Sequence, residues 1–327
     1  MKKTIAIVAG GDSSEHAVSL KSAAGIKTFL DPALYKSYTV SITRKGWFVH
    51  LSDEETAPID KNNFSFKTSS GNTIIFDFAI ITIHGTPGED GLLQGYFDLL
   101  GLPYSCSGTL ASALSFNKYI CNNYLRGFGI NVADSVCLQK NEAVDAAALI
   151  RRIGLPLFVK PNTGGSSFGV TKVKDAAQFA AALQQAFAES PEVLIEQSIK
   201  GTEVTCGCYK TKLKTVVFPI TEVVTHNEIF DFDAKYNGQS EEITPARIPD
   251  SIAGEIVETT AAVYDILRAK GLIRIDYIIN DSDSRPVLLD VNTTPGMTPT
   301  SFIPQQIRAA GLDIKNVFTD IIENELN

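Results

Sequence analysis

The first hundred residues repeat one order of elements: a short apolar run, a polar glycine-containing loop and a helical pattern. Residues 4–11, TIAIVAGG, lead into the loop DSSEH, and residues 76–85, FDFAIITIHG, lead into the loop GTPGEDG. A strand, a loop and a helix in series predict parallel βα units, whose loops gather at the carboxyl ends of the strands. Glu15 and His84 lie on these two loops. We therefore expect both side chains to share one crevice.

Two further blocks follow along the chain. Residues 107–196 carry helical patterns around two strand-like runs, and residues 197–327 begin with alternating strands. We predict three domains with these boundaries: 1–106, 107–196 and 197–327. Such a number fits a chain of 327 residues, since domains commonly hold about 100–200 residues.

The last block contains a long polar stretch and a hairpin. Residues 226–250 are too many for an ordinary connector, which predicts a functional lid. A helical pattern over 252–271 is expected to end at Gly271, where a left-handed cap would suit glycine. RIDYIIN and RPVLLDVN then flank the turn DSDS and predict an antiparallel hairpin over 274–292.

Charge and cysteine content narrow the classes of function. Lys and Arg number 29 against 37 Asp and Glu, a formal charge of −8. A surface of that sign disfavours nucleic acid and anionic membranes, so an anion needs a local gathering of cations. The five cysteines form no CxxC pair, and no apolar run resembles a signal peptide or a membrane span. These features predict a cytoplasmic protein.

The loop TGGSSFGVT, residues 163–171, has the composition of an anion-binding loop. Glycines let the backbone approach a ligand, and successive amides with serine hydroxyls form a nest for an anion. Val170 stands where a Walker A motif needs lysine, so that motif is excluded. The cation would come from Lys160, on the strand leading in, and from Lys118. A flexible hairpin turn is the alternative interpretation.

The predicted hairpin places four polar side chains together. Asp290 and Asn292 are two apart on one strand, and Arg274 and Asp276 are two apart on its partner, so each pair shares a face. Two carboxylates and an amide oxygen suit Mg²⁺, and the arginine can offset charge that develops in a reaction. An Arg–Asp ion pair across the ladder is the purely structural alternative.

The loop NTTPGMTPTSFIP follows the hairpin. Gly296 exposes backbone N–H groups, and Ser301 lies a few residues on. Together they can hold a substrate oxyanion or a carboxylate. A Pro- and Thr-rich loop without such a role is the alternative.

Taken together, these segments resemble the ATP-grasp superfamily and, within it, the D-alanine–D-alanine ligase family. The likeness spans nearly the whole chain in the family's order. It is carried by AGGDSSEHAVSL, IHGTPGEDGLLQG, LPYSCSGTLASALSFNK, VKPNTGGSSFGV, VLIEQSIKGTEVT, FDFDAKY, RIDY and LLDVNTTPGMTPTS. The resemblance implies an α/β fold of three domains: an N-terminal parallel α/β domain, then two α+β domains sandwiching ATP. It also implies ligation of two D-alanines through an acyl phosphate, for peptidoglycan precursor synthesis.

The resemblance implies roles for individual residues. The nucleotide would be bound by Lys118, Lys160, Gly165, Ser166, Ser167, Glu196, Gln197, Ile199, Glu203 and Lys235. In this set the lysines meet phosphates, residues 165–167 form a flap, residues 196–199 hold adenine and Glu203 holds ribose. Two Mg²⁺ ions, or Mn²⁺ in their place, would be held by Asp276, Asp290 and Asn292.

The same resemblance implies the substrate contacts. Glu15 and His84 would fix the first D-alanine, and Tyr236 would hydrogen-bond to Ser166 and Glu15. Arg274 and the Gly296 amide would stabilise the tetrahedral oxyanion, and Ser301 would bind the second substrate's carboxylate. No residue stands out as the base for the second amine. A homodimer is expected on the same ground.

Two departures and three alternatives accompany this interpretation. Many relatives carry lysine where Gln197 stands, and Asp290 replaces the more usual glutamate. A D-alanine–D-lactate ligase is the near alternative, but relatives that prefer the hydroxy acid usually lack the tyrosine of the Lys235-Tyr236 pair. A regulatory module would lack the metal ligands. A nicotinamide oxidoreductase would need GxGxxG, which GGDSSEH does not match.

Overall fold

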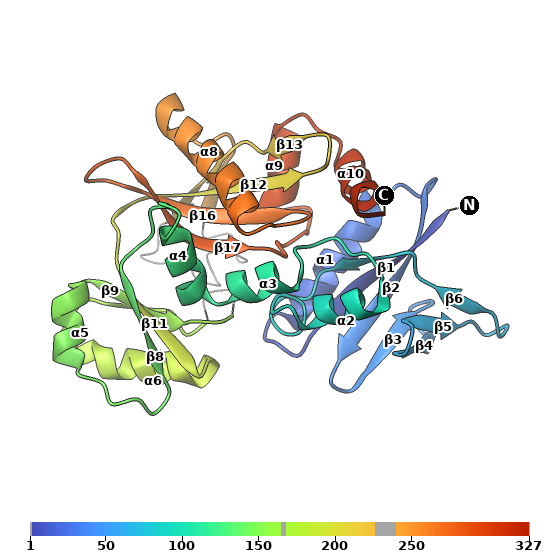
Figure 1. The fold of residues 1–327 in the computed structure, drawn as a ribbon, viewed down its shortest axis with the longest axis horizontal. Helices are drawn as coiled ribbons and strands as arrows, with labels where there is room; N and C mark the ends of the chain where they lie inside the picture. The colour runs from blue at the N-terminus through green and yellow to red at the C-terminus, as the bar shows by residue number, and fades with distance from the viewer. Residues whose placement is uncertain (1, 165–167, 226–239, 327) are drawn as a thin grey trace.

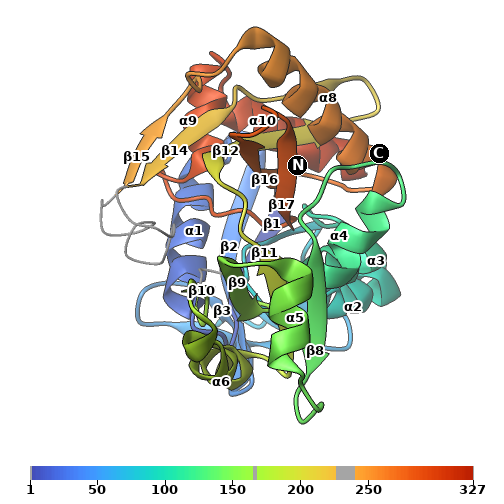
Figure 2. The same ribbon diagram turned by 90° about the vertical axis from the view of Figure 1, so that its left-hand side faces the viewer.

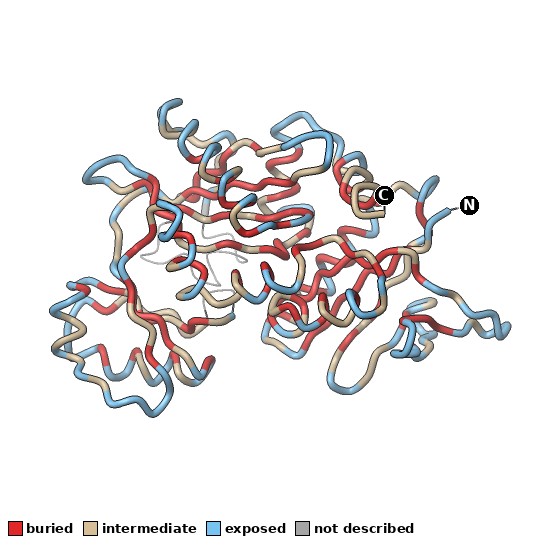
Figure 3. Tube along the Cα trace, in the orientation of Figure 1, coloured by how far each residue is buried: buried red, intermediate tan, exposed pale blue. Residues whose placement is uncertain are grey.

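The computed structural model describes residues 2–164, 168–225 and 240–326, which fold around three β-sheets. In Figure 1 the N-terminal and central sheets lie toward opposite ends, and the C-terminal sheet lies above them. The mixed α/β architecture agrees with the predicted fold class. Figure 3 shows the buried residues running along the strands of all three sheets.

The N-terminal sheet has seven strands in the order β6-β5-β4-β3-β2-β1-β7. Its elements are β1 (Lys3–Gly10), α1 (His16–Phe29), β2 (Tyr35–Thr43), β3 (Gly46–His50), β4 (Thr56–Asp60), β5 (Ser65–Lys67), β6 (Thr73–Ile75), β7 (Phe78–Ile81) and α2 (Leu92–Leu100). β1 pairs in parallel with β2 and with β7, as the βα pattern predicts. The strands from β2 to β6 pair antiparallel, which that pattern did not predict. Short connections between them permit only hairpins.

The central sheet has four strands in the order β10-β9-β11-β8. Its elements are β8 (Ser135–Gln139), α5 (Ala146–Ile153), β9 (Leu157–Pro161), β10 (Thr171–Val173), the short 3₁₀ helix η1 (Ala176–Gln178), α6 (Phe179–Glu189) and β11 (Glu192–Gln197). The sheet and its two α-helices enclose a core of their own, which includes Val159, Phe179 and Ile195.

The C-terminal sheet has six strands in the order β15-β14-β12-β16-β17, with β13 beside β12. Its elements are β12 (Gly201–Lys210), β13 (Thr215–Val217), β14 (Thr221–Thr225), β15 (Ser240–Ile243), α8 (Asp250–Ile266), β16 (Ile273–Asn280), β17 (Pro286–Asn292), α9 (Phe302–Ala309) and α10 (Ile314–Leu326). β16 and β17 form the predicted antiparallel hairpin.

α8 ends before the predicted residue. The helix stops at Ile266, and Arg268 takes a φ of 50°, which breaks the α-helical path. Gly271 also has a positive φ, 62°, but it lies beyond the helix, where a Cβ would fall 1.8 Å from the Ser105 carbonyl oxygen. The prediction that Gly271 caps this helix is therefore wrong. That glycine permits a close approach of two backbone segments.

The segment between the first two sheets packs on the third. α3 (Thr109–Phe116) and α4 (Lys118–Arg126) contact β17, and Figure 2 shows them beside that hairpin. Cys121, Leu125 and Val132 belong to the C-terminal core. The predicted block 107–196 is continuous in sequence. Its first part, however, packs on the C-terminal sheet.

α1 fixes the loop that follows β17. A Cβ at Gly25 would lie 2.4 Å from the Met297 carbonyl oxygen, so the two backbones touch. The buried Ser22 Oγ accepts a hydrogen bond from the Met297 amide at 3.2 Å. Ile26 and Met297 also share one core cluster. The N-terminal block therefore holds the Gly296 loop of the C-terminal block in place.

Candidate active site

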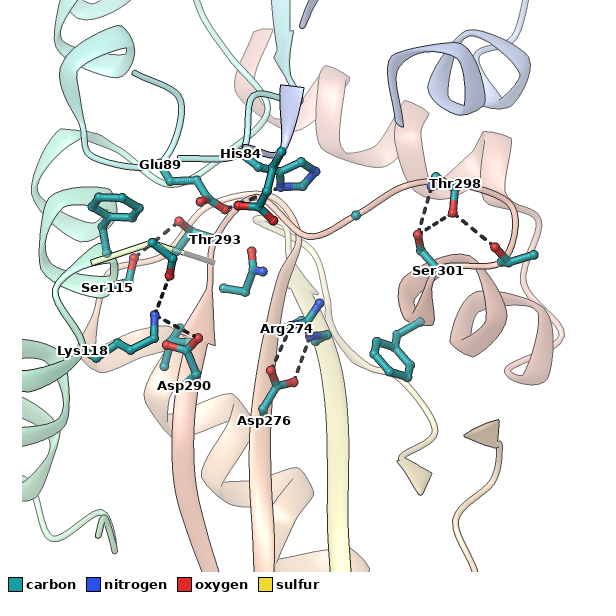
Figure 4. A pocket seen from close by; sticks show the side chains of 18 of the residues that line it. His84, Glu89, Ser115, Lys118, Arg274, Asp276, Asp290, Thr293, Thr298 and Ser301 are labelled. Carbon is teal, nitrogen blue, oxygen red and sulfur yellow. Dashed lines mark hydrogen bonds and ion pairs between the residues drawn. The ribbon is translucent and has the colours of Figure 1, made fainter. Parts of the chain in front are cut away.

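One pocket gathers predicted residues from the N-terminal loops, α4, the hairpin and the loop after it. They are Glu15, His84, Lys118, Arg274, Asp276, Asp290, Asn292, Gly296 and Ser301. Figure 4 shows Lys118 and Asp290 on one side, Thr298 and Ser301 on the other, Arg274 and Asp276 between them, and His84 and Glu89 above. The expectation that Glu15 and His84 share a crevice is confirmed.

The hairpin forms the floor of this pocket. Asp276 and Asp290 are cross-strand partners. Two residues along each strand, Arg274 is the cross-strand partner of Asn292. The Arg274 guanidinium grips the Asp276 carboxylate with two hydrogen bonds, Nε to Oδ1 and Nη2 to Oδ2, each 2.9 Å. Thr205 Oγ1 donates to Asp276 Oδ1 at 2.7 Å. The ion pair weighed as a structural alternative is thus present, but along one strand rather than across the ladder.

Lys118 supplies the second cation of the floor. Its Nζ lies 3.5 Å from Asp290 Oδ2 and donates to the Gly164 carbonyl at 2.9 Å. Burial alone would lower the pKa of Lys118, but the Asp290 charge outweighs it and the pKa is raised. Asn162, at the end of β9, accepts from the Lys118 and Tyr119 amides and so anchors this helix start.

The oxygens of the floor fit a hard divalent cation. Asp276 and Asp290 face each other across the ladder, and Asn292 lines the same pocket. Among the described residues no group of three or more His, Cys, Asp and Glu side chains could hold a metal ion. A magnesium ion at this floor would therefore take two carboxylates, one amide oxygen, and phosphate or water oxygens for the rest, as Mg²⁺ commonly does.

A buried histidine–carboxylate pair forms the wall above the floor. His84 Nδ1 lies 3.8 Å from Glu89 Oε1, and Glu89 Oε2 accepts from the Gly85 amide at 2.7 Å. Burial alone would lower the pKa of His84, but the hydrogen bond and charge of Glu89 raise it above 6.5. His84 Nε2 is buried and has no hydrogen-bond partner within the described part of the chain. Glu15, also buried, stands at the start of α1.

The far end of the pocket offers donors for an anion. Ser301 Oγ lies 2.8 Å from Thr298 Oγ1 and accepts from the Thr298 amide at 3.1 Å. A Cβ on Gly296 would lie 3.2 Å from Ser301 Oγ, so the backbone of Gly296 runs beside that hydroxyl. The Arg274 guanidinium lies 5.5 Å from the Phe302 ring centroid, a cation–π distance.

The predicted adenine and ribose residues lie apart from this pocket. Lys160 Nζ forms a 2.6 Å ion pair with Glu196 Oε2 on the neighbouring strand of the central sheet. Glu196 Oε1 is buried and has no partner among the described residues. Gln197 ends β11 and is exposed, Ile199 follows it, and Glu203 lies on β12. As far as the chain is described, the pocket lining includes none of these side chains.

Five predicted residues lie outside the described residues: Gly165, Ser166, Ser167, Lys235 and Tyr236. The predicted lid is described only from residue 240 on, as β15 and the start of α8.

Sequence reasoning missed several lining residues, among them Glu89, Ser115, Glu242, Thr298 and Phe302. The GEDG segment, which carries Glu89, held a usable signal because it follows the His84 loop directly. No sequence signal identified Glu242, because it stands in a polar stretch among other acidic residues.

Comparisons with known proteins place this geometry in a family. The sequence model described as "D-ala D-ala ligase N-terminus" matches residues 4–107, and that of the "D-ala D-ala ligase C-terminus" matches residues 124–323. A D-alanine–D-alanine ligase of Parabacteroides distasonis is 63% identical over 100% of this chain and 98% of its own. One from Bacteroides fragilis is 58% identical over 99% of this chain and 100% of its own.

Solved structures agree. The D-alanyl-alanine synthetase A of Vibrio cholerae has a TM-score of 0.88 at 30% identity, covering 99% of this chain and 98% of that chain. The D-alanine–D-alanine ligase of Bacillus anthracis complexed with ATP has a TM-score of 0.77 at 30% identity, covering 99% and 97%. The VanG D-Ala:D-Ser ligase of Enterococcus faecalis reaches 0.88 at 30% identity, covering 99% and 100%.

Proposed function

The chain belongs to the D-alanine–D-alanine ligase family and is an ATP-dependent ligase that joins two D-alanines, and from this premise we propose how its pocket divides the work. The first D-alanine's carboxylate attacks the γ-phosphate of ATP, which gives an acyl phosphate and ADP. The amine of the second D-alanine then attacks the acyl carbon, and phosphate leaves.

The observation that carries this assignment is the pairing of each floor carboxylate with a cation. Asp276 is held by Arg274, and Asp290 lies by Lys118. Asp276 and Asp290 would hold the metal of a bound nucleotide, and Arg274 and Lys118 would then meet its phosphates, so each charged side chain would keep a partner of opposite sign. Phosphoryl transfer depends mainly on such positioning and charge neutralisation.

Asp276, Asp290 and Asn292 would hold the Mg²⁺ ions, or Mn²⁺ in their place. The metal supplies neutralisation of phosphate charge when it is bound. The nucleotide is bound beyond the floor by residues on β9, β11 and β12 and in the connection from β11 to β12: Lys160, Glu196, Gln197, Ile199 and Glu203. The flap residues Gly165, Ser166 and Ser167, with Lys235 and Tyr236, complete the nucleotide and substrate contacts.

The wall binds the first D-alanine. Glu15 faces its ammonium group. His84, oriented by Glu89, meets its carboxylate through Nε2, for which the described residues offer no hydrogen-bond partner. Arg274 and the Gly296 amide stabilise the oxyanion at the acyl carbon. Ser301 binds the carboxylate of the second D-alanine. Each donor is fixed before substrate enters, which is the arrangement that lowers a barrier electrostatically.

The acceptor test uses the purified chain with ATP, Mg²⁺, D-alanine and an equal concentration of D-lactate at neutral pH. Chromatography should find D-alanyl-D-alanine as the main product, with one ADP formed per ligation. A product that is mainly the depsipeptide would contradict the assignment.

The assembly is a homodimer. Exposed apolar side chains lie on each of α2, α3 and α4: Leu92, Leu99, Leu110, Ile120 and Tyr124. α2 packs on α3, since Thr109 Oγ1 donates to Asp98 Oδ2 at 3.0 Å. An apolar face of this kind commonly marks a protein interface. A monomer in sedimentation equilibrium would contradict this assignment, and Leu99→Asp should separate the two subunits.

The enzyme makes D-alanyl-D-alanine for peptidoglycan precursors, and it does so in the cytoplasm, where ATP is available. None of the described helices is long and apolar enough to cross a bilayer.

The domains divide at 106 and 196, with α3 and α4 packed on the C-terminal sheet. D-alanine and ATP are the ligands, and nucleic acid and membranes are not partners, as the net charge of −8 indicates.

A further inference from the structure

One carboxylate of the pocket is left without a role. Glu242 lies on β15 and lines the pocket with Arg274, Ser301 and Phe302. Its Oε2 accepts a short hydrogen bond from Gln305 Nε2, and the same amide nitrogen donates to the Thr300 carbonyl at 2.7 Å. Gln305 follows Ser301 by one helical turn on α9. Glu242 is therefore fixed at the end of the pocket where the second D-alanine binds.

Glu242 differs from the other carboxylates there in what holds it. Asp276 is gripped by Arg274, Asp290 lies by Lys118, and Glu89 pairs with His84. For Glu242, a neutral amide is the one hydrogen-bond donor among the described residues, and Arg274 acts on it only through its charge. The charge of Glu242 is thus available to a cation that enters this end of the pocket.

The surroundings of Glu242 also make it a stronger base than an exposed glutamate. Burial raises the pKa of its carboxyl above 4.5, although the hydrogen bond from Gln305 and the charge of Arg274 act in the opposite direction. A carboxylate with a raised pKa accepts a proton more readily at neutral pH.

The second D-alanine presents both signs of charge. Its carboxylate is assigned to Ser301, which lines the pocket beside the oxyanion donors Arg274 and Gly296. Its ammonium group requires an anion, and it must also lose a proton before the nitrogen can attack. Glu15 is assigned to the first D-alanine, and the floor carboxylates to the metal.

We propose that Glu242 binds the ammonium group of the second D-alanine and accepts the proton that this group loses before attack. The inference rests on the proposed function of the pocket. One N–H bond breaks, its electron pair stays on nitrogen, and an O–H bond forms on Glu242. The freed pair forms the C–N bond as the acyl C–O bond breaks and phosphate departs. The nitrogen loses its second proton to the departing phosphate as the amide forms, and Glu242 passes its own proton to water.

This role makes Glu242 a determinant of acceptor choice. A 2-hydroxy acid such as D-lactate carries no ammonium group, so it forms no ion pair with this carboxylate. The enzyme therefore favours the amine over the hydroxyl acceptor partly through Glu242.

The test compares Glu242→Gln with Glu241→Gln. Glu241 is the neighbouring residue on β15 and is exposed, so it is a matched control. Each protein receives ATP, Mg²⁺ and D-alanine, with and without hydroxylamine, which is already unprotonated at neutral pH and traps the acyl phosphate as a hydroxamate. We expect Glu242→Gln to lose dipeptide formation by about 10²-fold, the usual contribution of a general base. Hydroxamate formation should stay within about twofold of wild type, since the base is not needed for it.

A third acceptor separates ammonium binding from a structural role. With D-alanine and D-lactate together, the ratio of depsipeptide to dipeptide should rise in Glu242→Gln. Only D-alanine loses an ion pair in this variant, the one between its ammonium group and Glu242. A ratio that does not rise, an equal loss of hydroxamate and dipeptide, or unchanged dipeptide formation would each overturn the inference. A wild-type protein that forms neither dipeptide nor hydroxamate would instead contradict the proposed function.

Discussion

The floor and the wall of the pocket balance their charges in different ways. On the floor, Arg274 and Asp276 keep 16% and 21% of their side chains exposed, and Lys118 and Asp290 keep 15% and 30%. On the wall, His84 and Glu89 keep 7% and 13%. The floor pairs are within reach of solvent, so the metal nucleotide that we propose for this pocket would be able to replace each partner. The wall pair is enclosed and holds one arrangement, which suits a site that orients a small substrate.

The largest effect is expected at the floor. Arg274→Lys keeps the charge but loses the two-pronged grip on Asp276 and the directed donors toward the pocket. We expect kcat for dipeptide formation to fall by about 10²–10³-fold, as when one oxyanion donor is lost. Arg285→Lys, on the exposed turn of the same hairpin, is the control. A loss of less than about threefold in Arg274→Lys would remove the arginine from the reaction.

The next effect is on stability and belongs to the wall. Glu89→Gln removes the charge that raises the pKa of His84. A group whose folded-state pKa is raised stabilises the fold below its unfolded pKa of about 6.5 and loses that contribution as pH rises through the raised value. At pH 6 the variant should lose about 2 kcal/mol of unfolding free energy, the usual scale for a charged hydrogen bond.

Urea denaturation of both proteins at pH 6 and at pH 9 measures this difference. The gap between wild type and Glu89→Gln should narrow at the higher pH, because His84 is then neutral. A gap that is constant with pH would show that the wall is not held by this charge pair.

The smallest effect concerns metal affinity. Asp290→Asn replaces one carboxylate of the floor and leaves Lys118 without its partner. The Mg²⁺ concentration for half-maximal activity should rise about tenfold, near the lower end of what perturbed metal sites show. Asp281→Asn, in the exposed hairpin turn, should leave the metal titration unchanged. An unaltered titration in Asp290→Asn would place the metal elsewhere.

The floor could be predicted from the sequence because its geometry is local. Strand alternation alone puts Arg274 with Asp276 and Asp290 with Asn292. The pairing of Asp276 with Asp290 also depends on a register shift between Asp276 and Tyr277, which the sequence did not indicate. Glu15 and His84 came from the order of strands and loops, which fixes where parallel strands end.

The remaining features depend on distant partners. Glu242 accepts a hydrogen bond from Gln305, which lies far from it in sequence, and the residues around either one do not indicate this contact. α3 and α4 follow the N-terminal sheet in sequence but bury Cys121 and Leu125 in the C-terminal core. α8 ends at Ile266, close to the left-handed Arg268, although Gly271 further along the chain was the predicted cap. Tertiary packing decided each of these cases.

The most direct test of the account is metal-dependent ligation at the floor. Purified protein is given ATP and D-alanine, either with Mg²⁺ or with the metal removed by EDTA, and dipeptide and ADP are quantified. We predict D-alanyl-D-alanine and ADP in equal amounts with Mg²⁺, neither product without it, and recovery of both when Mn²⁺ is added. Dipeptide formation at the same rate in EDTA would contradict the assignment of Asp276, Asp290 and Asn292 to the metal.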